Sequence, residues 1–167
     1  MAWQTNNNKD SVICSTASPS KTREDWKWGT KKDIEDLFKE STDYVTIAEN
    51  NLIYRYPPDT NNKNKYNFGR LTTSKIRNIL SIVNGIYNKL VLNTSSDELD
   101  PDITNEIRYM KVRFIYEAGR ESDVETFCSN TKIIDAIDLI NTKNDFIRYS
   151  RYLEALVAYH RFYGGKD

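Results

Sequence analysis

The only histidine of the chain, His160, is the first residue to consider for catalysis. A histidine acts as a general base only beside a nucleophile or a carboxylate that it can reach. Its sequence neighbours are hydrophobic, and the nearest preceding acidic residue, Glu154, lies far round the same predicted helix. We expect His160 to be a core histidine bonded to a backbone or tyrosine oxygen, with a general base as the alternative.

Other patterns that carry chemistry are weak or absent in this sequence. Asp135 and Asp138 stand at i and i+3 and could both ligate magnesium, but an ordinary solvated helix face has the same spacing. Cys14 and Cys128 lie far apart without C-x-x-C spacing, which indicates neither a disulfide nor a zinc site. The sequence contains no phosphate-binding G-x-x-x-x-G-K-S/T loop, no G-x-S-x-G and no H-E-x-x-H. We predict no catalytic residue, no metal, no cofactor and no enzymatic activity.

The charge balance limits how the chain can bind nucleic acid. It has 24 lysines and arginines against 24 aspartates and glutamates, a formal net charge of zero. A neutral chain cannot hold RNA or DNA by bulk electrostatic attraction. Any nucleic-acid site must therefore be a local group of basic residues.

Two predicted helices carry such groups. On the helix predicted for residues 100–118, Tyr109, Arg113 and Tyr116 form a stripe that Arg120 extends into the following turn. Tyrosines and arginines on one edge can stack on bases or riboses and pair with phosphates.

The second group lies on the helix predicted for residues 73–92. Arg77 shares the face away from the core with serine and asparagine side chains, and Lys75 lies at the amino-terminal end, where the helix dipole favours an anion. For both groups the alternative is an ordinary solvated face with ion pairs at i and i+4.

The elements that position these residues are helices. Apolar residues recur with a period near 3.6 in each segment, and no segment alternates with period two for long enough to form a strand. Asp100 before Pro101, Thr142 with Asp145, and Ser122 with Glu125 are typical of helix starts, and Gly119 is typical of a helix end. We predict an all-α bundle of five or six helices, with short antiparallel connections between the last four.

The domain organisation follows from the composition. Residues 1–29 are polar, with Trp26 and Trp28 as the exceptions, and we expect a flexible, disordered N-terminal tail. Residues 30–167 form one helical domain, in which residues 56–70 are a loop rich in Asn, Lys and Pro. No stretch approaches the roughly 18 apolar residues of a membrane span. We expect a cytoplasmic protein without membrane contact.

Three blocks of sequence carry a more specific signal. Residues 71–80 (LTTSKIRNIL), 109–120 (YMKVRFIYEAGR) and 154–167 (EALVAYHRFYGGKD) together resemble the small subunit of the type III-A CRISPR effector, the Csm interference complex. The resemblance covers roughly residue 44 to the end of the chain. It does not include the tail before Thr30 or the Asn-rich loop around Asn61.

The resemblance implies a non-catalytic helical subunit, present in several copies that neighbour one another along a filament. Such a subunit packs beside the other subunits of the complex and lines the guide (CRISPR) RNA and target RNA through sequence-independent contacts. On the matching blocks it implies RNA contacts at Lys75, Arg77, Lys111, Arg113, Arg120 and Arg161.

Two points stay open at the level of sequence. Lys111 lies nearer the buried face of its helix than the other five candidates. A protein-only adaptor, whose aromatic surfaces such as Trp28, Tyr159 and Tyr163 bind partner subunits without touching RNA, is the alternative function.

Overall fold

The structure is a computed structural model that describes residues 31–39, 41–54, 56–92 and 96–167. Within these ranges the chain forms seven helices, five of them with ten residues or more, and no strand. The prediction of an all-α fold is confirmed, whereas the tail predicted for residues 1–29 lies outside the described residues. The helices are α1 (Lys31–Leu37), α2 (Tyr44–Ile53), α3 (Thr73–Leu92), α4 (Pro101–Arg120), α5 (Ser122–Thr131), α6 (Ile133–Ile137) and α7 (Lys143–Phe162).

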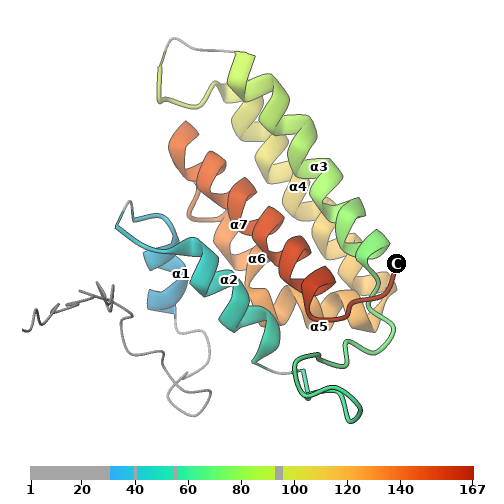
Figure 1. Ribbon diagram of the computed structural model, residues 1–167. Helices are drawn as coiled ribbons and strands as arrows, with labels where there is room; N and C mark the ends of the chain where they lie inside the picture. The colour runs from blue at the N-terminus through green and yellow to red at the C-terminus, as the bar shows by residue number, and fades with distance from the viewer. Residues whose placement is uncertain (1–30, 40, 55, 93–95) are drawn as a thin grey trace, which may run out of the picture.

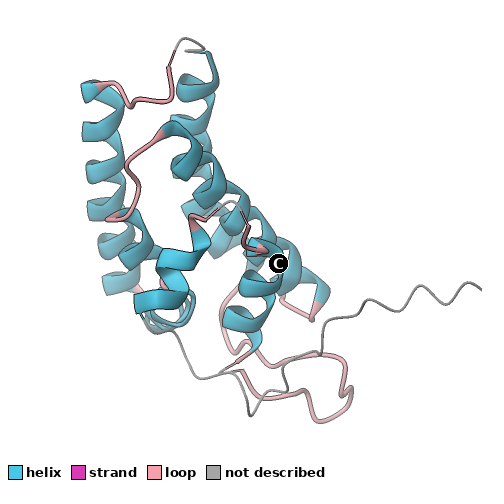
Figure 2. Ribbon diagram, turned by 90° about the vertical axis from the view of Figure 1, so that its left-hand side faces the viewer, coloured by secondary structure: helices cyan, strands magenta, loops and turns pink. Residues whose placement is uncertain are grey.

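Helix α7 lies at the centre of the fold, between α2 on one side and α3 on the other (Figure 1). Phe146, Leu153 and Leu156 on its apolar side are completely buried. Helix α4 runs antiparallel to α3, and α5 and α6 pack against α4. Figure 2 shows helix as the only regular secondary structure of the described chain. Helices α3 and α4 therefore form a two-helix layer with one face on the core and one face outward.

The starts of the long helices are fixed by side chains that the sequence singled out. The Asp100 carboxylate accepts a hydrogen bond from the Asp102 N–H at 2.8 Å, with Pro101 at the first helical position. At the start of α7 the Thr142 hydroxyl accepts from the Asp145 N–H, and the Asp145 carboxylate accepts from the Thr142 N–H. Both caps satisfy N–H groups that have no partner inside the helix.

The predicted boundary between α4 and α5 was wrong in detail. Helix α4 continues through Gly119 to Arg120, because a glycine inside a helix weakens it without ending it. Ser122 is the first residue of α5 and not its cap, since Glu121 occupies the cap position and makes no side-chain cap hydrogen bond.

The segment after the helix start predicted at Ser122 forms two short helices, α5 and α6. Lys132 between them has φ of 57°, a left-handed conformation that ends the first helix. Two buried tyrosines stabilise the break: the Tyr152 hydroxyl donates to the Thr131 carbonyl at 2.7 Å, and the Tyr149 hydroxyl donates to the Ile133 carbonyl at 3.0 Å. These long-range hydrogen bonds decide the break, which local periodicity could not show.

The C-terminal residues close the fold against segments far away in the sequence. The Thr73 N–H donates to the Lys166 carbonyl at 2.6 Å, and the Tyr66 N–H donates to the Tyr163 carbonyl at 2.9 Å. Gly164 has φ of 103°, which a residue with a side chain rarely adopts. The end of the chain consequently lies beside the start of α3 (Figure 1).

No helix among the described residues is both long enough and apolar enough to cross a membrane.

Candidate nucleic-acid interface

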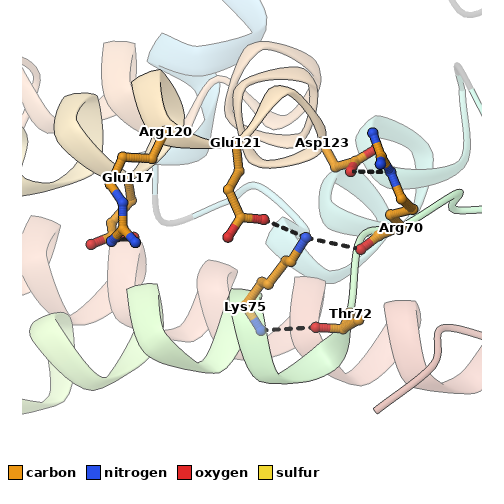
Figure 3. Close-up of polar contacts among 7 residues, drawn as sticks. All are labelled: Arg70, Thr72, Lys75, Glu117, Arg120, Glu121 and Asp123. Carbon is orange, nitrogen blue, oxygen red and sulfur yellow. Dashed lines mark hydrogen bonds and ion pairs between the residues drawn. The ribbon is translucent and has the colours of Figure 1, made fainter.

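Lys75, at the amino-terminal end of α3, is held by neighbouring groups of the same chain. Its ammonium pairs with the Glu121 carboxylate and donates to the Arg70 carbonyl at 3.1 Å. Arg70 in turn lies 3.7 Å from the carboxylate of Asp123 in the first turn of α5. Figure 3 shows both cations reaching from the start of α3 toward the start of α5. Lys75 therefore joins two helices, and an RNA phosphate would have to compete with Glu121 for it.

Arg120 ends α4 on the outer side of the molecule. Its guanidinium lies 3.6 Å from the Glu117 carboxylate and 5.5 Å from the centre of the Tyr116 ring, and its side chain is 57% exposed. An exposed ion pair of this kind is weak, on the order of 0–1 kcal/mol. Arg120 can therefore exchange Glu117 for a phosphate at little cost.

Arg113 and Arg77 are exposed, and neither has an ion-pair partner among the residues that the structure describes. Arg113 lies on α4 beside a groove that also contains Tyr109. Arg77 lies on the outward side of α3, a helix without a single acidic residue. Their guanidinium groups are available to an anionic ligand.

The remaining two candidates are engaged in other contacts. Lys111 donates to the Asp138 carboxylate at 2.6 Å, so it faces α6, as its place near the buried side of α4 suggested. Arg161 pairs with Asp167 at 3.1 Å and donates to the Gly165 carbonyl at 3.1 Å. The six candidates thus do not form one patch. Arg113 and Arg120 share the outer side of α4, and the other four lie elsewhere.

The carboxylates considered for magnesium are also accounted for. Asp138 pairs with Lys111, and Asp135 lies 3.8 Å from the Lys132 ammonium. The described part of the chain contains no group of three or more His, Cys, Asp or Glu side chains able to hold a metal ion.

His160 is completely buried, as the sequence predicted for a core histidine. Its Nδ1 lies 3.3 Å from the Thr73 hydroxyl, and the ring also has a backbone hydrogen bond with Leu71. The predicted backbone partner is therefore present, and the side-chain partner is a threonine and not a tyrosine. Burial lowers the pKa of His160 to about 4. A neutral ring closed off from solvent is in no position to act as a general base.

Sequence reasoning missed the apolar side chains on the outer face of α4. Val112 is 58% exposed and Ile115 is 52% exposed, close to Tyr109 and Tyr116, which are 65% and 62% exposed. Arg108, also exposed, adds a third arginine to this face. The signal was present in the sequence, because 109, 112 and 116 are spaced as neighbours on one helix face, opposite the buried Ile107, Met110 and Phe114.

The family is decided by comparison with known proteins. The family model described as Csm2 Type III-A matches residues 51–166, which include all six candidate residues. The chain belongs to the Csm2 family. Csm2 is the small subunit of the type III-A CRISPR Csm complex, so the resemblance found in three sequence blocks is confirmed.

Relatives from three bacterial genera support the assignment to Csm2. The chain is 46% identical over 99 residues to the CRISPR system Cms protein Csm2 of Enterococcus italicus, covering 58% of this chain and 70% of the relative. Identity to the protein of the same name from Streptococcus thermophilus is 39% over 104 residues, covering 62% and 81%. For the Mycobacterium tuberculosis protein it is 34% over 126 residues, covering 75% and 94%. This Csm2 chain is therefore a structural subunit of the type III-A interference complex.

Proposed function

We propose that this Csm2 chain is a non-catalytic subunit that lines the guide and target RNA through sequence-independent contacts, in several copies along the complex. Base pairing between guide and target reads the sequence, so each copy needs only a few phosphate contacts, and repetition multiplies them. The neighbouring copies and the other Csm subunits are its protein partners.

The observation that carries the proposal is the charge of the α3–α4 layer. These two helices contain seven basic residues and three acidic ones, although the whole chain is neutral. Arg77 and Arg113 have no carboxylate partner among the described residues, and Arg120 has only an exposed one. Phosphate oxygens match the geometry of guanidinium groups and form strong, charge-assisted hydrogen bonds with them.

The test is to replace Arg77, Arg113 and Arg120 together by alanine and to measure retention of target RNA by the assembled complex. The three side chains are exposed, so the variant should fold normally. We expect weaker retention of target RNA. The slope of log K against log salt concentration should also become shallower, by roughly 0.7–0.9 for each phosphate that the variant no longer binds.

A matched control removes three exposed cations from other elements, by changing Lys39, Lys63 and Arg151 to alanine. The control variant loses the same total charge as the arginine variant. If the loss of RNA retention belongs to α3 and α4, the control complex should retain RNA as well as the unmodified complex does. Equal affinity of both variants at moderate salt would rule out the assigned residues.

The exposed Val112 and Ile115 favour a second candidate function, a protein-only adaptor that docks other subunits through the outer face of α4. The aromatic surface considered from sequence is less accessible to a partner protein, because Tyr159 and Tyr163 are half-buried. The Tyr163 hydroxyl also donates a hydrogen bond to the Glu49 carboxylate. Trp28 lies outside the described residues. An adaptor would give no RNA adducts when the assembled complex is crosslinked with ultraviolet light.

A further inference from the structure

A groove of about 280 Å³ runs between α3 and α4 on the outer side of the layer. Its apolar lining comes from Ile82 and Ile86 of α3 and Met110 of α4. Gly85 also lines it, and a Cβ at this position would meet no atom within 4 Å. The volume lies just below the roughly 300–1,000 Å³ of drug-sized ligand sites, which suits a small flat group.

The edge of the groove that belongs to α4 carries a tyrosine and an arginine. Tyr109 and Arg113 both line it, and their spacing of four residues places them side by side on the helix. The Tyr109 side chain is 65% exposed, so one face of its ring can accept a stacking partner. Further along the groove, the Lys89 ammonium pairs with the Glu106 carboxylate at 2.6 Å. Among the described residues that line the groove, Arg113 is therefore the charged side chain without an ion-pair partner.

We propose that this groove receives one unpaired nucleobase of the RNA, stacked on Tyr109, with the neighbouring phosphate on Arg113. The inference rests on the proposed function and specifies one subsite for it. Stacking on an aromatic ring tolerates every base, because each base has a π face. The contact would therefore be independent of the guide sequence, as a lining subunit requires.

The charges favour a nucleotide over an apolar side chain of a partner protein. Helix α3 has no acidic residue, so nothing on its wall of the groove repels a phosphate. An apolar side chain would bury Tyr109 and the groove lining but would leave the Arg113 guanidinium without a counter-charge. A nucleotide satisfies both the apolar lining and the arginine.

The experiment uses the reconstituted complex with 4-thiouridine in the guide and target RNA, ultraviolet crosslinking, and mass spectrometry of the adducts. We expect an adduct on the peptide that contains Tyr109. Gly85→Leu should fill the groove and lower the yield of this adduct roughly tenfold, as loss of base stacking does. Gly85→Ala is the matched control, because it makes a similar gain in helix propensity but adds only one methyl group.

The outcomes separate this inference from the proposed function. Adducts on α3 or α4 elsewhere, with none on Tyr109, would overturn the subsite and leave the RNA-lining function standing. A Tyr109 adduct of equal yield in Gly85→Leu would also overturn it, as would a protein crosslink from the groove to another subunit. No RNA adduct anywhere on the chain would refute the proposed function itself.

Discussion

Gly165 shows how one residue fixes the closure of the C-terminal segment. A Cβ added at this position would lie 2.6 Å from Nε2 of His160 and closer still to Cε1 and Nδ1. The imidazole ring cannot move aside easily, since it is completely buried and its centre lies 4.5 Å from that of the Phe68 ring. The backbone of residue 165 therefore fits against the ring only as glycine.

Gly165→Ala should lower the free energy of unfolding by about 1–3 kcal/mol, because overpacking a filled site forces neighbours out of place. The midpoint of urea unfolding measures this. Gly119→Ala is the control: a Cβ at residue 119 meets nothing within 4 Å, so this change should stabilise α4 by up to about 1 kcal/mol. Equal midpoints for Gly165→Ala and the parent protein would contradict the steric argument.

Arg148 acts at the level of whole elements, since it ties the α1–α2 connection to α7. Its Nε donates to the Leu37 carbonyl at 3.0 Å, and one terminal nitrogen donates to the Lys39 and Thr42 carbonyls at 2.6 and 3.0 Å. The guanidinium also lies 5.9 Å from the centre of the Tyr44 ring. The Leu37 carbonyl ends α1, where the helix cannot satisfy it, and the other two carbonyls lie in the connection to α2.

Arg148→Met keeps the apolar stem of the side chain but removes all three hydrogen bonds. We expect a loss of about 2–3 kcal/mol, in the range for hydrogen bonds from a charged group, and faster amide hydrogen exchange in α1 and α2 than in α3. Arg151→Met, three residues further along α7 and exposed, should change stability by less than about 0.5 kcal/mol. Uniformly faster exchange over all helices would show that Arg148 has no special link to α1.

The comparison of elements shows what the sequence could predict. Helices α3, α4 and α7 follow from apolar periodicity and local caps, and Asp43 caps the start of α2. The break between α5 and α6 depends on Tyr149 and Tyr152, which are distant in sequence.

The same limit applies to the candidate site. Periodicity placed Arg77 and Arg113 on outer faces, but the partners of Lys75 and Lys111 come from other helices and carry no local signal.

At the scale of the whole molecule, the positive charge is unevenly distributed. The α3–α4 layer has more basic than acidic residues, so the rest of this neutral chain carries a net negative charge. A protein with separated charges of this kind orients itself in the field of RNA without binding RNA strongly at every face. This distribution agrees with the proposal that α3 and α4 face RNA while other surfaces contact protein.

The stability of the whole molecule should depend on pH through His160, where the segment of Phe68 and Thr73 meets the C-terminal segment of Gly165. Burial lowers the pKa of His160 to about 4 from an ordinary value of 6.5. Between these values the unfolded chain binds a proton that the folded chain does not, so the free energy of unfolding should fall as the pH drops from about 6.5 toward 4. The slope from this group is at most about 1.4 kcal/mol per pH unit. Urea unfolding between pH 4.5 and 7.5 measures the slope, and His160→Gln should reduce it.

Because His160 is the only histidine, an NMR titration of its ring protons in the unmodified protein checks the cause directly. A folded-state pKa of His160 near 6.5 would refute the prediction.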